Sequence, residues 1–318
     1  MNCLLEKLRF ILPVFSCAFL LPAMAFADLI DNDVPAGTVG HFEVDVDPGG
    51  QSETANITAN GAISGTTTTN VVYEMINYVQ TGAGVSALSG TGSITTEDTY
   101  VSSGSFVGSN GNTVFWRSTA SIADGDSAMR NEITFTVNSN ETLGDLRFMN
   151  YLDQDVFGIT DILFTRGSLA GGDLELFTVD QDEEAGISQS GAYSDSQGLV
   201  NSTFEGWAAD EYSDLQDDIT AGTAAFSLTG EVDMISLPAF VDPTFGPAFG
   251  PEDITTALSW VIDPNASSAT VITYLGGVPD VIDIPPTNPV PEPSSMALLA
   301  MGLTGLGCAS RRRKNAAK

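Results

Sequence analysis

Hydrophobic and polar residues alternate with a period of two over many short stretches of the chain. Residues 42–46 are Phe-Glu-Val-Asp-Val, and residues 132–137 are Glu-Ile-Thr-Phe-Thr-Val. Successive side chains of a β-strand point to opposite faces, so this period predicts strands with one buried face. Apolar-rich stretches predict further strands at residues 71–79, 113–119, 146–152, 161–166, 174–179, 257–262 and 269–275.

Turn residues separate these predicted strands. Asp263, Pro264 and Asn265 stand between the last two, and this order predicts a β-hairpin. Gly, Asn, Asp and Ser lie between most of the others. Many short strands with such connections predict an all-β fold, either an antiparallel β-sandwich or a jelly roll.

One segment has a helical period instead. Between residues 207 and 222, the apolar residues Ala208, Tyr212, Leu215 and Ile219 recur at helical spacing. We therefore expect one short amphipathic helix that packs on the sheets. Its other face is acidic, which is typical of a solvated surface.

The N-terminus has the three parts of a secretory signal peptide. Two basic residues precede an apolar run over residues 10–26, and Ala25 and Ala27 provide the small residues of a cleavage site. The alternative is an uncleaved anchor. Because the run is short and contains two prolines, we expect cleavage between Ala27 and Asp28.

The C-terminus combines an apolar run with the densest positive charge of the chain. Residues 294–310 carry no charge, and Arg311, Arg312, Arg313 and Lys314 follow directly. As a helix this run spans about 25 Å, which is marginal for a hydrocarbon core of about 30 Å. Positive residues are retained in the cytoplasm, so the pattern predicts a transmembrane helix with the larger part of the chain outside. The alternative is a buried core helix, but four cations would then have no evident partner.

These features divide the chain into five parts. A signal peptide (1–27) precedes an exported acidic β domain (28–277), and six of the 15 prolines fall in the extended spacer that follows (278–293). The transmembrane helix (294–310) and a basic cytoplasmic tail (311–318) complete the chain. All three cysteines lie in the terminal parts, so the β domain has no disulfide framework.

Negative charge dominates the exported part. The whole chain has a formal net charge of -30, and residues 28–291 contain 39 acidic residues against four arginines and no lysine. Such a surface repels phosphate backbones and anionic headgroups, which argues against a nucleic-acid partner. Solubility or adaptation to salty or calcium-containing surroundings is the simplest explanation of the charge.

The tail has the order of a known sorting signal. Pro291, Glu292 and Pro293 precede the apolar run, and the basic cluster closes it. This order resembles the PEP-CTERM sorting signal of Gram-negative bacteria, and the resemblance covers the C-terminal tail only. It implies that an exosortase, a membrane protease, recognises the tail and processes it near the Pro-Glu-Pro motif. It also implies an association with exopolysaccharide, biofilm or floc formation.

Metal candidates are weak. Asp45 and Asp47, and likewise Asp153 and Asp155, have an Asp-x-Asp spacing that suits Ca²⁺. None of them follows the twelve-residue EF-hand pattern, so solvated acidic surface is the competing interpretation. We expect no other cofactor.

Histidine and aromatic residues also have two interpretations. His41, the only histidine, is expected on the exposed face of a strand, as an isolated surface residue or as a metal ligand or base. Four large aromatic residues are candidates either for a sugar-binding platform or for the core: Trp116, Tyr151, Trp207 and Trp260.

We therefore expect an exported surface or matrix protein with a structural or adhesive role and no enzymatic activity. Its partners would be an exosortase-like membrane protease and an exopolysaccharide. The alternatives are a secreted carbohydrate-active enzyme with an Asp/Glu pair, a calcium-binding or carbohydrate-binding module, and a permanently anchored single-pass protein.

Overall fold

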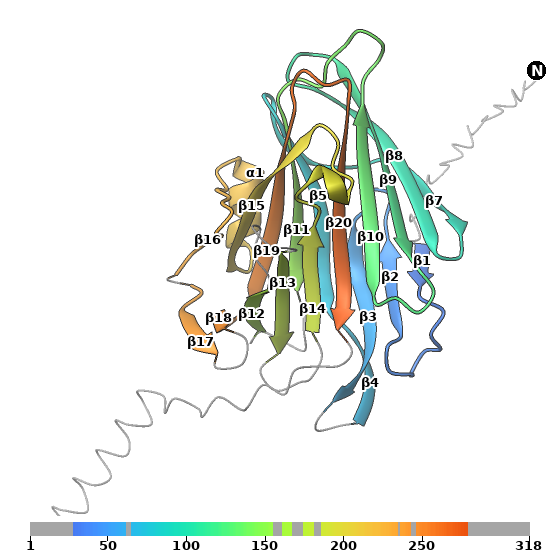
Figure 1. Ribbon diagram of the computed structural model, residues 1–318, viewed down its shortest axis with the longest axis vertical. Coiled ribbons are helices and arrows are strands. Elements are labelled where there is room, and N and C mark those ends of the chain that lie inside the picture. The colour runs from blue at the N-terminus through green and yellow to red at the C-terminus, as the bar shows by residue number, and fades with distance from the viewer. Residues whose placement is uncertain are drawn as a thin grey trace, which may run out of the picture.

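The computed structural model describes residues 28–61, 65–154, 161–166, 174–180, 186–234, 236–242 and 246–278. Within these residues the chain forms two ten-stranded β-sheets. The sheets lie face to face as a sandwich (Figure 1). The prediction of an all-β antiparallel sandwich with one short helix is confirmed.

The first sheet is antiparallel except at one edge, where β15 and β16 run parallel. Its order is β1 (Asp28–Asp31), β2 (Phe42–Val46), β3 (Ser52–Gly61), β5 (Val72–Thr81), β11 (Leu146–Gln154), β19 (Ile254–Ile262), β15 (Ser202–Glu211) and β16 (Glu231–Val232). Two further strands, β4 (Gly65–Asn70) and β6 (Gly84–Ala87), pair with β3 and β5 respectively.

The second sheet is antiparallel at each of its strand pairs. Its order is β17 (Ala239–Asp242), β18 (Gly246–Glu252), β12 (Asp161–Arg166), β13 (Glu175–Asp180), β14 (Gly186–Gly191), β20 (Ser268–Val278), β10 (Ala128–Thr136), β9 (Thr113–Ile122), β8 (Thr99–Val107) and β7 (Thr91–Thr96). A 3₁₀ turn, η1 (Asp195–Gln197), precedes β15.

The predicted strands all form, but the predicted hairpin between the last two is wrong. β19 pairs with β11 and β15 in the first sheet, whereas β20 pairs with β10 and β14 in the second. The turn at Asp263 therefore carries the chain from one sheet to the other. Its local bonds are those of an ordinary tight turn, since the amide of Ala266 donates to the Asp263 carbonyl at 3.1 Å.

A second crossing lies beside the first, and this explains why the turn does not close a hairpin. The connection from β10 to β11 also passes between the sheets, and its Leu143 amide donates to the Ala266 carbonyl at 2.9 Å. The Val137 amide likewise donates to the Ser267 carbonyl at 3.1 Å. The two crossings support each other, so β19 and β20 find partners on strands far away in sequence.

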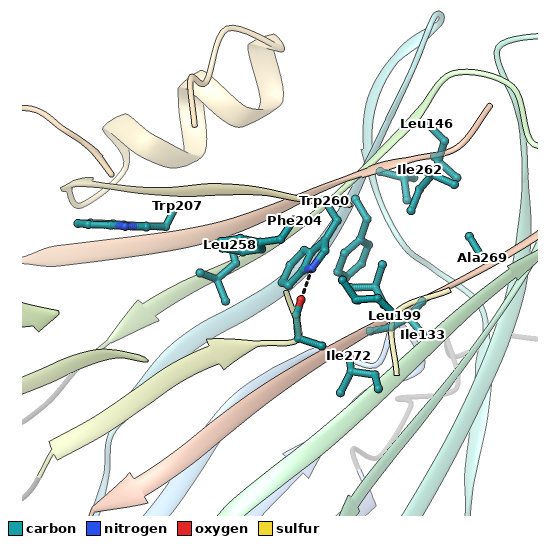
Figure 2. Packing of buried hydrophobic residues seen from close by; sticks show 14 of the residues in the cluster. Ile133, Leu146, Leu199, Phe204, Trp207, Leu258, Trp260, Ile262, Ala269 and Ile272 are labelled. Atoms are coloured by element: carbon teal, nitrogen blue, oxygen red, sulfur yellow. Dashed lines mark hydrogen bonds between the residues drawn. The ribbon is translucent and has the colours of Figure 1, made fainter. Parts of the chain in front are cut away.

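The core consists of apolar side chains from both sheets. Figure 2 shows part of the largest cluster, in which Trp260 lies beside Phe204 and above Ile272. The Trp260 indole Nε1 donates to the Ala192 carbonyl at 2.8 Å, so its one polar atom is satisfied in the core. A second apolar cluster surrounds Met75, Leu152 and Leu275.

A layer of polar side chains separates these two clusters. Along β5, buried Asn77 stands between Val79 of the first cluster and Met75 of the second. The same inward position is polar on the neighbouring strands: Asn150 on β11, Asn131 on β10, Ser118 on β9, Gln189 on β14 and Thr273 on β20. The sandwich interior is therefore apolar, polar and apolar along the strand direction.

The helix is shorter than its apolar spacing indicates. Residues 207–211 belong to β15, and α1 spans only Asp214–Ala221. The helical prediction is thus wrong for Ala208 and Tyr212 and confirmed for Leu215 and Ile219, which are buried. Gly222, with φ 75°, ends the helix in the left-handed conformation. α1 lies beside β15 (Figure 1), where it covers the outer face of the first sheet.

Candidate functional site

The residues of the predicted sorting and processing sites lie outside the described residues. These are Pro291, Glu292 and Pro293, the basic residues Arg311, Arg312, Arg313 and Lys314, and Ala25 and Ala27 at the predicted signal cleavage site. The predicted transmembrane segment 294–310 lies outside them as well.

Among the residues that the structure describes, no helix has the length and apolar character needed to cross a membrane.

Asp47, one of the calcium candidates, accepts hydrogen bonds within its own turn. Its Oδ1 accepts from the amides of Gly49 at 2.7 Å and Gln51 at 3.1 Å, and its Oδ2 accepts from Gln51 Nε2 at 3.1 Å. These bonds close the turn between β2 and β3. The carboxylate of Asp47 therefore serves as a turn cap.

The other calcium candidates do not form a metal site together with Asp47 among the described residues. Asp45 lies on β2, Asp153 is buried on β11, and Asp155 is outside the described residues. Within the described ranges, the only acidic group with the geometry of a metal site consists of Asp33, Asp98 and Asp124, none of which is a candidate from the sequence.

Asp33 and Asp124 are exposed and Asp98 is half-buried, and their ligand oxygens fall within 4.8 Å of one another. Partial burial, and then the negative charges of Asp33 and Asp124, raise the pKa of Asp98. Burial and the repulsion between like charges both disfavour the ionised form of Asp98.

His41 is buried, so the prediction of an exposed histidine is wrong. The residue is 3% exposed, and Nδ1 lies 2.6 Å from the Val34 carbonyl oxygen. Nε2 lies 3.4 Å from Oε2 of Glu43. The ring thereby connects Val34, in the loop before β2, with Glu43 of β2.

All four candidate aromatic residues of a sugar platform belong to the interior. Trp116, Tyr151, Trp207 and Trp260 are each at most 3% exposed. Three of them lie in the largest core cluster, and Tyr151 lies under α1. The core interpretation of these residues is therefore confirmed.

A groove at one end of the first sheet brings different aromatic residues together. Its volume is ≈ 590 Å³, and its lining residues are Thr54, Asn70, Tyr73, Glu74 and Tyr212. They come from the start of β3, the end of β4, the start of β5 and the residue after β15. Antiparallel pairing across β5, β11, β19 and β15 brings these distant segments to the same end of the sheet.

Two exposed tyrosines form one side of this groove. Tyr73 is 57% exposed and Tyr212 is 45% exposed. Their ring centroids lie 6.3 Å apart with the planes at 89°, an edge-to-face contact. Because the amide of Tyr212 donates to the Asp253 carbonyl at 2.8 Å, its position after β15 is anchored.

Helix α1 orients the groove carboxylate. Gln216 Nε2 donates to Glu74 Oε2 at 3.0 Å and to the Tyr78 hydroxyl at 3.2 Å. Asn70 secures the opposite wall, because its Oδ1 accepts from the Ala55 amide at 2.9 Å and its Nδ2 donates to the Val72 carbonyl at 2.8 Å. The groove is thus held by side-chain bonds from two elements.

Acidic side chains lie near the Tyr212 hydroxyl. The neighbouring Tyr73 hydroxyl, then burial, then the charges of Asp153 and Glu74 raise the pKa of Tyr212. Each contribution opposes formation of a phenolate. A tyrosine hydroxyl is protonated at neutral pH even with its ordinary pKa, so the Tyr212 hydroxyl is available as a hydrogen-bond donor.

Sequence patterns alone do not identify the groove. Tyr73 falls inside a predicted strand, next to the register shift between Asp153 and Gln154 of β11, and Tyr212 has the spacing of a predicted helix. Nothing in the sequence indicates that Tyr73 and Tyr212 meet.

Comparison with family models assigns the tail. Residues 289–314 match the model described as the PEP-CTERM protein-sorting motif. The chain carries a PEP-CTERM sorting motif in its C-terminal tail. The motif contains Pro291, Glu292 and Pro293 and reaches Lys314, as predicted. It implies an exported protein that interacts with an exosortase and is sorted by it.

Comparison with solved structures finds distant similarities of fold. A bacterial glucoamylase complexed with acarbose has a TM-score of 0.40 and 13% identity, with 71% of this chain and 30% of the glucoamylase covered. A GalM/aldose epimerase homologue from C. elegans has a TM-score of 0.41 and 7% identity, with 79% of this chain and 99% of the homologue covered. The chain thus spans 30% of the length of the glucoamylase. No curated protein matches the chain.

Proposed function

We propose that this is a surface or extracellular-matrix protein with a structural or adhesive role in biofilm or exopolysaccharide, delivered by a signal peptide and processed by an exosortase. The observation that carries this proposal is the PEP-CTERM motif at residues 289–314. The β domain is the part of the chain that is delivered, and the C-terminal tail directs its sorting.

The residue types of the tail support export of the β domain followed by processing of the tail. Pro291 and Pro293 disfavour a helix around Glu292, and a protease requires an extended, accessible segment. The uncharged run after it holds the motif close to the outer face of the inner membrane. Arg311 and the basic residues that follow oppose transfer of the tail through the bilayer.

Mass spectrometry of the mature termini tests the proposal. The protein is isolated from fractionated cells that contain the exosortase and from cells that lack it. We expect an N-terminus at Asp28 in both kinds of cell and a C-terminus near Pro291 only in the cells that contain the exosortase. A surface form that retains residues 311–314 would contradict the sorting proposal.

Matched variants make this test specific for the motif. Replacing Pro291, Glu292 and Pro293 by alanine should leave the precursor in the membrane fraction. Replacing Pro285 and Pro286 by alanine changes the same spacer without touching the motif. We expect processing of this control to match the wild type, and equal loss in both variants would instead indicate a general requirement for proline.

We also propose that the β domain is not an enzyme. The observation that favours the enzymatic alternative is that Glu74 and Asp153 are register partners on β5 and β11. However, Asp153 is buried and does not line the groove, whereas glycosidases present both carboxyl groups to the sugar. Hydrolysis of an oligosaccharide that disappears in Glu74→Gln would favour the enzyme; binding without turnover supports the structural role.

A further inference from the structure

We propose that the groove lined by Tyr73, Glu74 and Tyr212 binds an uncharged polysaccharide chain. This inference names a ligand class and a site for the structural or adhesive role proposed above. It relies on that role in one respect, because it places the domain where extracellular polysaccharide is present.

The size and openness of the groove suit part of a longer chain. Its volume of ≈ 590 Å³ falls within the range of about 300–1,000 Å³ that is usual for ligand sites. Tyr73 and Tyr212 are about half exposed, so the site lies at the surface and is open to solvent. A polymer can therefore occupy it with a few units while the rest of the chain extends beyond it.

The lining matches the two kinds of surface that a sugar ring offers. A pyranose has an apolar C–H face and a rim of hydroxyl groups, and tyrosine likewise combines an apolar ring with a polar tip. The Tyr73 and Tyr212 rings provide apolar contact area, and the protonated Tyr212 hydroxyl provides a donor.

Glu74 provides the complementary acceptor. A carboxylate offers about four lone-pair sites, so Glu74 can accept from Gln216 and from a ligand hydroxyl at the same time. Because Gln216 fixes the carboxylate from α1, the acceptor is oriented before the ligand arrives, which lowers the entropic cost of binding.

Charge selects against acidic polymers. Glu74 lines the groove, and Asp153 and Asp253 act on the Tyr212 hydroxyl from beside it. Together with the net charge of -30, these carboxylates repel uronate, sulfate and phosphate groups. The same repulsion acts against the phosphate groups of a nucleic acid.

A glycan array probed with the full-length chain in detergent tests the site. The array carries uncharged oligosaccharides of several linkages, polyuronate oligomers and cationic amino-sugar oligomers. We expect retention on uncharged glycans and none on polyuronates. Affinity for the retained glycan is then measured by isothermal titration calorimetry.

Three variants and one control locate the binding. Tyr73→Ala, Tyr212→Ala and Glu74→Gln should each weaken the affinity by about tenfold or more. Phe115→Ala is the matched control, because Phe115 is 44% exposed and lies on β9 of the other sheet. We expect its affinity to equal that of the wild type. Circular dichroism should show the same melting curve for Tyr212→Ala and Phe115→Ala.

Three results would overturn the proposal: no uncharged glycan is retained, Phe115→Ala weakens binding as much as the groove variants do, or only cationic oligomers bind and are released by salt. The last would show that surface charge alone attracts the ligand. Failure of sorting is a separate result, because the termini found by mass spectrometry do not depend on sugar binding.

Discussion

At the scale of single residues, Thr256 shows how the polar layer joins the two sheets. Its hydroxyl donates to Gln189 Oε1 at 2.8 Å and accepts from Gln154 Nε2 at 2.7 Å. Gln189 Nε2 in turn donates to Asn150 Oδ1 at 2.8 Å, and Asn150 Nδ2 donates to Asn77 Oδ1 at 2.9 Å. Buried polar groups are costly unless they are paired, so this chain of bonds favours one alignment of the sheets over others.

Thr256→Val should therefore destabilise the fold although it keeps the side-chain shape. The substitution removes the hydroxyl that pairs with Gln154 Nε2 and with Gln189 Oε1 in the interior, and each unsatisfied buried group costs about 1–3 kcal/mol. Urea denaturation measures the loss. Thr136→Val, at an exposed position of β10, is the control and should stay within about 0.5 kcal/mol of the wild type. Equal stability of the two variants would contradict the role of the layer.

The raised pKa of Tyr151 predicts how the free energy of unfolding depends on pH in the alkaline range. Burial and then the charge of Asp153 raise its pKa above the usual value of about 10. The unfolded chain then loses the proton first as the pH rises. The stabilisation is complete below about pH 10 and falls above it by about 1.4 kcal/mol per pH unit. Tyr151→Phe should reduce this slope in urea melts between about pH 9 and 11; an unchanged slope would show that Tyr151 ionises freely in the folded protein.

At the scale of elements, α1 links the core to the groove. Its buried residues Leu215 and Ile219 lie one helical turn apart and contact a cluster on the outer face of the first sheet that includes Ile76 and Tyr151. Between them, Gln216 reaches Glu74. A helix of only 8 residues is not stable alone, so packing on the sheet keeps it folded.

Ile219→Ala should loosen this attachment. Ile219 is fully buried, and truncation of such a side chain costs about 2–5 kcal/mol. Thr220→Ala, at the next and exposed position of α1, is the control and should change stability little. Urea denaturation followed by circular dichroism compares the two. If they are equally stable, α1 does not depend on the contact of Ile219 with the sheet.

At the scale of the whole molecule, the acidic surface is the dominant property. Self-repulsion within a chain of net charge -30 destabilises the compact state and is strongest at low ionic strength. A net charge far from zero favours solubility and repels anionic polymers.

Salt should therefore stabilise the folded protein. The screening length falls from about 30 Å at 0.01 M to about 8 Å at 0.15 M ionic strength, so the melting temperature should rise over this range of NaCl. CaCl₂ and MgCl₂ at equal concentration should then give equal melting temperatures. A distinctly larger rise with calcium would show a specific calcium site, for which the group of Asp33, Asp98 and Asp124 has the geometry, and would contradict the interpretation of the acidic residues as solvated surface alone.

The sequence by itself determined the local structure and the tail. The strand at residues 161–166 forms within the predicted bounds, because alternation and apolar runs depend on neighbouring residues only. Strands rich in small polar residues, such as β7 (Thr-Gly-Ser-Ile-Thr-Thr), carry too little alternation to be found in this way. The PEP-CTERM motif was recognisable because its order of elements is linear in the chain.

Only the tertiary structure decided which strands share a sheet and which residues share a site. The same turn residues at Asp263 serve a hairpin and a crossing between sheets equally well, and strand partners distant in sequence selected the crossing. The pairing of strands distant in sequence also places Trp260 in the core and Tyr212 at the surface. Long-range pairing, which no local pattern encodes, brought Tyr73 and Tyr212 to one end of the first sheet.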